Sequence, residues 1–417
     1  MLVDLYPLRR KLGGKWMRDH VRAIFEAGVA AADPFEAVTA ALQGLSRPTH
    51  VIALGKAAPR MAAAVHAQFP GIPSLIVTTD QPVPELENTQ VMIGDHPVPS
   101  ERSAAAGEAA LEWLAAIARE HGPKAHVLAL ISGGGSALCV APVAGVTLAQ
   151  KAAVNASLLG AGLDIVRMNI VRQALSRTKG GGLLRAALPA QMTSLVLSDV
   201  VGDDPRAVAS GPTAGPISDI AEARQIVRDA GLWADMPVSV QAALSREDRA
   251  NATPRAEVRM VGSNALSVRA MSKAAPDARV IDAALEGDVA EAAARIVTLA
   301  RSGSGMWLMG GETTVLLRGT GRGGRNQELA LRVARALRDL DRPFVFLSGG
   351  TDGRDGPTDA AGGIVDNGTW ARIGPEAQAL LANNDSYAAL SRAGDLLQMP
   401  ATGTNVADLQ ILWVGAG

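Results

Sequence analysis

The feature that most constrains the fold is an alternation of short aliphatic runs with segments of helical periodicity along the chain. The runs include "HVIALG", "SLIVTT", "HVLALI" and "TSLVLS". They are continuously apolar instead of alternating with polar residues, which is typical of strands covered on both faces. Strands of this kind that are followed by helices form parallel sheets. The sequence therefore predicts an α/β protein.

A chain of 417 residues is long for a single domain. The stretch from Gly211 to about Pro254 is helical and charged, and the α/β alternation resumes after it. We therefore expect two α/β domains, at residues 17–255 and 256–417, with residues 1–16 as an N-terminal extension. The "GGETT" turn between short strands indicates an antiparallel piece in the second domain. The cleft between two domains is the default place for an active site.

Bulk properties exclude several classes of partner. A formal net charge of −1 gives no support for nucleic acid or an anionic membrane surface. The one cysteine, Cys139, excludes an internal disulfide framework, and it suits a core position in a cytoplasmic protein. Residues 127–150 carry no charge and could span a bilayer by length, but the glycines at 133–135 break that segment. We expect no membrane span.

Glycine-rich and charged loops follow several of the predicted strands. Lys56 comes directly after a strand, and the segment Ser132–Ser136 (SGGGS) offers consecutive amide groups that could bind an anion. Asp199 and Asp352 also lie just beyond strands. Each loop alone is commonly only a tight turn or a helix cap. Together they supply the cations, amides and magnesium-binding carboxylates that phosphoryl transfer requires.

A dinucleotide-binding loop is the main competing interpretation. Gly319, Gly321 and Gly324 fit the spacing G-x-G-x-x-G, and a helical stripe of apolar residues follows. The acidic residue expected at the end of the next strand is missing, and Arg322 and Arg325 lie inside the loop. We therefore expect the glycines to give Arg325 the freedom to reach across a cleft.

Other catalytic templates do not fit. The chain has no P-loop and no protein-kinase motif set, and its six histidines show no metal-ligand spacing. Ser176 and Lys179 form S-x-x-K, but its usual partner motifs are absent. The segment from Asp164 to Lys179 instead indicates a helix with a basic face that ends at glycines.

Ten segments occur in the order found in one enzyme family. They are "ALGKAA", "GDHPVPSERS", "LISGGGSAL", "NIVRQALSRTKGGGL", "LSDVVGDDPRAVASGPT", "GGETTV", "GRGGRNQELAL", "SGGTDGRDGPTDAAGG", "NNDSY" and "TGTNVADL". In these segments the chain resembles the MOFRL-type glycerate 2-kinases, whose members are also labelled hydroxypyruvate reductase. The resemblance runs from about Met17 to the C-terminus.

The resemblance implies a Rossmann-like parallel-sheet domain, a smaller MOFRL domain, and an active site in the cleft between them. It implies ATP- and Mg²⁺-dependent phosphorylation of D-glycerate at the 2-hydroxyl, with ATP and D-glycerate as the small-molecule partners. A homodimer is compatible with it. The lysine after the first strand and the arginine in "GGRNQE" correspond to Lys56 and Arg325, which the resemblance marks as essential cations.

Further site residues are weaker expectations. Asp199 is the first candidate for hydroxyl activation or for Mg²⁺, and Asp352 is the second. The loop Ser132, Gly133, Gly134, Gly135 and Ser136 is the candidate phosphate site. His96, in "GDHPVP", contacts substrate or caps a turn. The remaining candidate binding residues, which lie in the resembling segments, are Arg172, Glu312 and Asn326.

Two other functions stay open at this point. A hydroxypyruvate reductase would oxidise NAD(P)H, and a non-catalytic protein would bind a nucleotide or a hydroxy acid without turnover. The sequence does not decide the preference among hydroxy acids.

Overall fold

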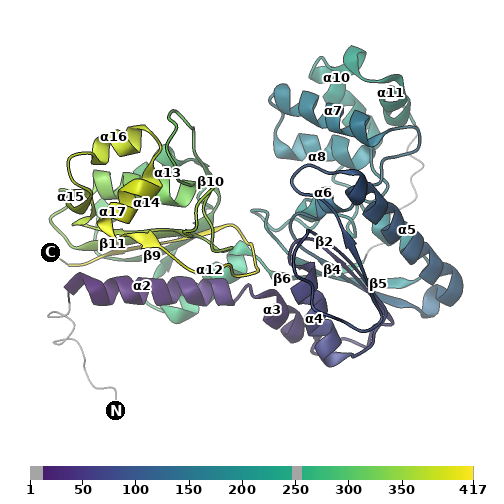
Figure 1. Ribbon diagram of the computed structural model, residues 1–417, viewed down its shortest axis with the longest axis horizontal. Helices are drawn as coiled ribbons and strands as arrows, with labels where there is room; N and C mark the ends of the chain where they lie inside the picture. The colour runs from purple at the N-terminus through teal and green to yellow at the C-terminus, as the bar shows by residue number, and fades with distance from the viewer. Residues whose placement is uncertain (1–12, 247–255, 417) are drawn as a thin grey trace. The chain divides into compact units, whose positions relative to one another are not determined.

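The computed structural model describes residues 13–246 and 256–416 (Figure 1). The chain divides into two compact units. The N-terminal unit runs from Pro34 to Val261, and the C-terminal unit combines the chain up to Asp33 with the chain from Gly262 onward. Each unit has its own sheet and its own hydrophobic core.

The N-terminal unit is built on a six-stranded sheet in the order β3-β2-β1-β4-β5-β6. The strands are β1 His50–Leu54, β2 Ser74–Thr78, β3 Thr89–Ile93, β4 His126–Ile131, β5 Gln191–Leu197 and β6 Glu257–Gly262. The four pairings from β3 to β5 are parallel. The predicted parallel sheet is therefore confirmed, and its strand order is that of a Rossmann fold.

Helices cover the central strands of this sheet and also form a separate group. The helices beside the sheet are α3 Pro34–Leu42, α4 Ala58–Gln68, α5 Glu101–His121, α6 Gly135–Leu138 and α9 Gly182–Ala187. The helices α7 Leu148–Gly160, α8 Ile165–Ala174, α10 Ile220–Asp229 and α11 Val238–Leu244 pack on one another around a small core of their own (Figure 1). The helix expected over residues 164–179 ends at Ala174, and the chain continues with Ser176 in a β-bridge to Pro142 before it turns at the left-handed Gly180 and Gly181.

The C-terminal unit has a mixed sheet in the order β13-β12-β11-β14-β9-β7. Its strands are β7 Arg279–Val280, β9 Gly305–Gly311, β11 Phe344–Gly350, β12 Gly362–Asp366, β13 Leu396–Leu397 and β14 Asp408–Val414. A separate parallel pair joins β8 Gly287–Asp288 to β10 Thr313–Thr314. All the pairings from β13 to β9 are antiparallel. Antiparallel pairing, expected in this half of the chain, is therefore present in most of this sheet, but the strands on either side of the "GGETT" turn, β9 and β10, lie in different sheets.

Helices lie on both faces of the mixed sheet (Figure 1). One face carries α2 Gly13–Ala30 and α12 Asn264–Ala274, and the other carries α13 Val289–Ser302, α14 Arg325–Ala336 and α17 Ser386–Ala393. Two short helices complete this unit, α15 Thr369–Ile373 and α16 Ala377–Ala382.

The N-terminal helix α2 belongs to the C-terminal unit, which differs from the expected boundary at residue 17. Ile24 and Phe25 of α2 are buried against Leu347 of β11 and Leu409 of β14. Arg18 of α2 also forms ion pairs with Asp366 and Asp395, which come much later in the chain. The expected extension lies outside the described residues up to residue 12, and from Gly13 the chain is helical.

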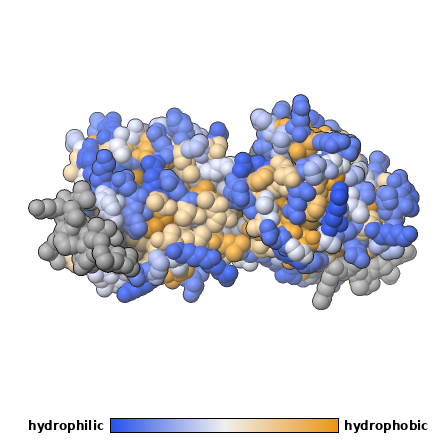
Figure 2. Space-filling model, turned by 90° about the horizontal axis from the view of Figure 1, so that it is seen from below, coloured by the Kyte–Doolittle hydropathy of each residue, from blue (hydrophilic) through white to orange (hydrophobic). Residues whose placement is uncertain are grey.

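No helix in the described part of the chain is long and apolar enough to cross a membrane. The break predicted in residues 127–150 is real: β4 ends at Ile131, and the glycine turn leads into α6. Figure 2 shows hydrophilic side chains interspersed with apolar areas on the face seen there. Cys139 is buried, and that burial raises its pKa to about 12. The thiol therefore stays protonated, as is typical of a cysteine in a core.

Candidate active site

The two most prominent loops predicted from sequence lie together at the point where the strand order of the sheet reverses. That point is between β1 and β4, which are neighbours. Lys56 follows β1, and the segment Ser132–Ser136 follows β4. In open α/β sheets, ligands bind beyond the carboxyl ends of the strands at this reversal. The fold therefore singles out these two loops as the binding edge of the N-terminal unit.

Backbone contacts lock the two loops together. The Lys56 N–H donates to the Gly133 carbonyl at 3.0 Å, and the Ser132 N–H donates to the Leu54 carbonyl at 2.9 Å. The Ser132 hydroxyl accepts the Ala57 N–H at 3.1 Å. Gly55 has φ +124°, and a Cβ there would overlap Ser132. Ser132 is thus buried, and it holds the loops in place instead of facing a ligand.

Gly134 is surrounded by the side chains of Lys56 and His96. It adopts φ +85°, and an added Cβ would lie 3.1 Å from Lys56 Cγ and 3.3 Å from His96 Cδ2. Burial lowers the pKa of His96, and the nearby Lys56 charge lowers it further. The His96 ring is therefore neutral at neutral pH, and Lys56 is the exposed cation beside the glycine turn.

Asp199, after β5, reaches the same turn. A Cβ on Gly133 would overlap the carboxylate of Asp199, so the glycine is needed for this approach. The structure thus brings together three of the predicted site residues, Lys56, His96 and Asp199, around Gly133 and Gly134.

Ser136, at the far end of the loop, is the centre of a second group. Its hydroxyl lies 2.5 Å from Lys179 Nζ and 2.9 Å from Arg172 Nη2. Lys179 Nζ also donates to the Ser136 carbonyl at 2.6 Å. Lys151 Nζ donates to the Arg172 and Leu175 carbonyls at the end of α8. We call Lys151, Arg172 and Lys179 the basic cluster.

The basic cluster gathers three basic side chains that no carboxylate balances. Within the described ranges, none of its three side chains is paired with Asp or Glu. Burial lowers the pKa of Lys151 to about 7, and the Arg172 charge adds to the effect. Burial, followed by the Lys151 and Arg172 charges, holds the pKa of Lys179 well below its ordinary range. Such a cluster attracts an anion.

The backbone opposite Ser136 is strained. Ala209 and Ser210, which are not glycines, have φ of +51° and +59°, and Gly211 follows with +63°. Non-glycine residues in this region cost of order 1 kcal/mol each, and they concentrate at functional sites. The conformation places the Ser210 hydroxyl 3.1 Å from that of Ser136.

Arg325, in the C-terminal unit, is held by two carboxylates. Its Nε and Nη2 donate to Asp408 at 2.6 and 3.0 Å, and its Nη1 donates to Glu312 at 2.6 Å. Burial lowers the pKa of Arg325, but the bonds and charge of Asp408 outweigh it and raise the pKa, so the guanidinium stays charged. The freedom expected for Arg325 is therefore wrong for this structure.

The glycines before Arg325 serve close packing. A Cβ on Gly319 or Gly321 would overlap Asn383, and one on Gly323 would overlap Ser386. Asn384 Oδ1 accepts the Gly319 N–H at 3.1 Å. The segment "NNDSY", noted in the sequence, thus holds the glycine loop in place.

A carboxylate occupies the place that a pyrophosphate would take in a dinucleotide fold. Asp355 accepts the N–H groups of Asn326 and Gln327 at the start of α14, at 3.1 and 2.8 Å. A Cβ on Gly324 would overlap Asp355. Burial raises the pKa of Asp355 to about 7. The dinucleotide interpretation of this loop is not supported, although the predicted apolar stripe at Leu329 and Val333 is buried.

The other predicted residues of this unit have different surroundings. Asn326 is buried, and its Oδ1 accepts the Ser348 hydroxyl at 2.6 Å, so its contacts are with the protein. Asp352 Oδ1 accepts the Arg354 N–H at 2.9 Å in a turn. Glu312 is exposed apart from its pair with Arg325. No group of three or more metal-ligating side chains is found in the described residues.

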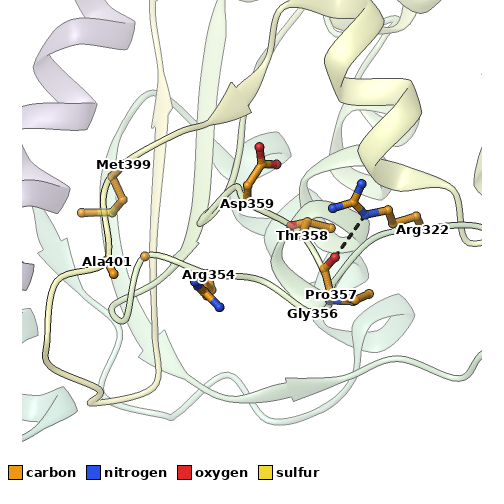
Figure 3. A pocket seen from close by; sticks show the side chains of 9 residues that line it. Arg322, Arg354, Gly356, Pro357, Thr358, Asp359, Met399 and Ala401 are labelled. Carbon is orange, nitrogen blue, oxygen red and sulfur yellow. Dashed lines mark hydrogen bonds between the residues drawn. The ribbon is translucent and has the colours of Figure 1, made fainter. Parts of the chain in front are cut away.

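A cavity of about 450 Å³ lies in the C-terminal unit (Figure 3). It is lined by Arg322, Gly353, Arg354, Gly356, Pro357, Thr358, Asp359, Met399 and Ala401. Arg322 is fixed, because its Nε donates to the Pro357 carbonyl at 3.1 Å and its guanidinium lies 4.7 Å from the Tyr387 ring centre. The cavity has the size of a small-molecule site.

Sequence reasoning missed Lys179, Lys151, Asp408 and Asp355 as functional or supporting residues. The only local signal was the "TKGGG" segment, whose glycines directly follow Lys179, the residue that contacts Ser136. The partners of Asp408 and Asp355 are distant in sequence, so no local spacing marked them.

Comparisons with known proteins agree with this architecture. A family model described as "Domain of unknown function (DUF4147)" matches residues 20–245, and the MOFRL family model matches residues 305–408. A protein of Agrobacterium vitis named as a hydroxypyruvate reductase is 39% identical, over 95% of this chain and 94% of its own length. The glycerate 2-kinase of Pyrococcus horikoshii is 34% identical, over 94% and 96%. The crystal structure of a glycerate kinase from Thermotoga maritima has a TM-score of 0.89 and 32% identity, and the match covers 96% of this chain and 100% of that one.

Proposed function

The chain belongs to the glycerate kinase family that joins a DUF4147 domain to a MOFRL domain, and from this membership we propose that it is a glycerate 2-kinase. It transfers the γ-phosphoryl group of ATP to the 2-hydroxyl of D-glycerate, which gives 2-phosphoglycerate and ADP. One observation carries the proposal within the structure. At the strand-order reversal, Lys56, a glycine turn and the unbalanced basic cluster provide the positive surroundings that two anionic substrates require.

Several of the predicted residues have a part in this reaction. Lys56 is an exposed point charge for the phosphate oxygens, and the amides of Gly133, Gly134 and Gly135 orient them. Asp199, which lies over the same turn, accepts the proton of the substrate hydroxyl as that oxygen attacks. These groups act by position and charge, which is the main source of catalysis in phosphoryl transfer.

Mg²⁺ requires oxygen ligands, and Asp199 supplies a carboxylate at the glycine turn. In kinases, Mg²⁺ is bound by one or two carboxylates together with the phosphates of the substrate. Asp199 is the first carboxylate that we propose, either for the proton transfer or for Mg²⁺, and Asp352, the second candidate from the sequence, lies in the other unit and stays a prediction. When bound, Mg²⁺ would neutralise charge on the phosphates.

Arg325 is the second essential cation of the proposal. Because Asp408 and Glu312 hold three of its nitrogen atoms, it acts as a fixed charge for the transferring group or a carboxylate. Its expected joint action with Lys56 stays a prediction, since the two residues lie in different units. A cytoplasmic location and a homodimer also stay predictions.

The reductase alternative has less support. The turn after β1, where a dinucleotide fold needs three glycines, has Gly55 but then Ala57 and Arg60. The other glycine loop has its helix amides occupied by Asp355. One relative is named as a reductase, but this chain lacks the glycine loop that a dinucleotide cofactor would require.

Paired assays test the proposal. Purified protein with ATP, Mg²⁺ and D-glycerate should release ADP, followed by a coupled enzyme reaction. The same protein with NADH and hydroxypyruvate should leave NADH unoxidised. Rapid NADH oxidation without ADP release would favour the reductase, and binding without either turnover would favour the non-catalytic alternative.

A further inference from the structure

The basic cluster points to one chemical group of the substrate. We propose that Arg172 binds the carboxylate of the hydroxy acid, and that Ser136 and Lys179 are positioning residues behind it, with Lys179 determining specificity. The inference rests on the proposed function and deepens it.

Hydrogen-bond accounting defines the site. A hydroxyl has one donor and two acceptor positions, and a guanidinium can only donate. Arg172 and a charged Lys179 fill both acceptor positions of Ser136. The Ser136 proton then goes to Ser210 at 3.1 Å, and Ser210 donates to Asn169 Oδ1 at 3.3 Å. The chain of bonds is complete, so the side chains are held in place before any ligand arrives.

Arg172 is the member of the cluster that a ligand can reach. Its side chain is partly exposed, whereas Lys179 is only 2% exposed. Its Nη1 and Nη2 contact Asn169 and Ser136, and its Nε has no hydrogen-bond partner among the described residues. A planar guanidinium suits a carboxylate, which it can bind with two parallel bonds. Lys179 adds positive charge from behind through Ser136.

The loop itself orients the acid. Asp199 and Lys56 lie on the Gly133–Gly134 side of the loop, where the hydroxyl must meet the phosphoryl group. The Cα atoms of Gly134 and Ser136 are two residues apart, and so at most about 7 Å apart. The carboxylate and 2-hydroxyl of a 2-hydroxy acid are on adjacent carbons. One small molecule can therefore place its hydroxyl at Asp199 and its carboxylate at the basic cluster.

Carboxylate binding should take up protons. The depressed pKa values of Lys151 and Lys179 arise from burial and mutual repulsion, both of which a bound anion offsets. Among the described residues, the charged or titratable groups that act on Lys179 are Lys151, Arg172 and the Cys139 thiol, and the one that acts on Lys151 is Arg172. Binding should therefore be tighter below about pH 7 than above it, because the protonated cluster is the form that the anion favours.

Steady-state kinetics of matched variants test the assignment. Lys179→Met should raise KM for D-glycerate by about tenfold or more, the worth of one charged hydrogen bond, with KM for ATP unchanged. Lys179→Arg should recover part of the loss. The control is Arg177→Gln, since Arg177 is an exposed neighbour paired with Glu108, outside the site. Its KM values should match those of the unaltered enzyme.

Two further measurements separate this site from a structural role. Arg172→Gln should also raise KM for D-glycerate. This variant tests the same site if Lys179→Met fails to fold. Calorimetry of D-glycerate binding in two buffers of different ionisation enthalpy should show proton uptake, reduced in Arg172→Gln. A rise in KM for ATP instead, or kinetics equal to those of Arg177→Gln, would overturn the inference. If the unaltered enzyme makes no phosphoglycerate, the proposed function fails, whereas the calorimetry still tests the carboxylate site.

Discussion

Arg325 in the C-terminal unit and Lys179 in the N-terminal unit are both basic residues in dense hydrogen-bond networks, but their partners differ in charge. Arg325 is paired with two carboxylates, and Asp408, which accepts two of its hydrogen bonds, is fully buried. Lys179 is hydrogen-bonded to Ser136, and its charged neighbours are Lys151 and Arg172. The positive charge of Arg325 is therefore balanced by carboxylates of the protein, whereas the basic side chains around Lys179 have no such counter-charge.

The difference separates two uses of buried charge. Removing one partner of a balanced pair leaves the other charge buried alone, so such a pair is tied to folding. A cluster of like charges is costly until an anion neutralises it, so it is tied to binding. We therefore expect the Arg325 network to contribute to stability and the basic cluster to contribute to substrate affinity.

The largest effect is expected from Lys56→Ala. Lys56 is exposed beside the glycine turn, so its loss should lower kcat/KM by roughly 100-fold or more while the free energy of unfolding stays unchanged. ADP release and urea denaturation measure the two quantities. Near-normal turnover would remove Lys56 from the site and weaken the whole assignment of the N-terminal unit.

Asp408→Asn should separate the two networks by stability. The substitution leaves Arg325 without its main counter-charge, and we expect it to cost about 3 kcal/mol of unfolding free energy. Arg172→Gln, which removes one of several like charges, should cost little or even stabilise the protein without substrate. Equal losses in both variants, measured by denaturation, would contradict the comparison.

The pH dependence of stability should have opposite signs in the two units. Lys151 has a pKa of about 7 when folded against an ordinary 10.5, so between these values the unfolded chain binds more protons and stability rises with pH. Asp355 has a pKa of about 7 when folded against an ordinary 3.8. Its contribution is fully present below about pH 4 and is lost as pH rises through 7.

Denaturation across pH with two variants checks these slopes. Lys151→Met should flatten the rise above pH 7, and Asp355→Asn should flatten the fall below it. The slopes have independent causes, so each variant serves as the control for the other. Unchanged slopes in both would mean that neither group titrates as described.

The smallest effect is expected from Arg354→Gln at the cavity of the C-terminal unit. Its side chain is exposed, so either KM should change by less than about threefold, as for a rim charge. Steady-state kinetics measure this. A tenfold rise in KM for ATP would instead place nucleotide binding at that cavity and shift part of the site to the C-terminal unit.

The parallel sheet and its loops could be predicted because they depend on local patterns. Continuous apolar runs marked β1 and β4, and residues that follow adjacent parallel strands must meet at one edge, which brings Lys56 and Gly133 together. The glycine spacing at Gly319–Gly324 misled the interpretation, because the same spacing serves close packing against Asn383.

Contacts between distant segments could not be predicted. The helix α2 packs on strands more than 300 residues later, and its apolar face does not specify which sheet it covers. Lys179 lay in a segment with helical periodicity, and only the fold brings it to Ser136. Asp408 and Asp355 resembled ordinary loop carboxylates until their partners at Arg325 and α14 were visible.

The central claim is that the chain phosphorylates D-glycerate at its 2-hydroxyl, and the position of the phosphate in the product tests it most directly. Purified protein should be incubated with ATP, Mg²⁺ and D-glycerate, and the product examined by ³¹P and ¹³C NMR. The account predicts 2-phosphoglycerate as the product, with one ADP formed for each molecule. Formation of 3-phosphoglycerate, or no phosphoglycerate together with NADH oxidation by hydroxypyruvate, would contradict it.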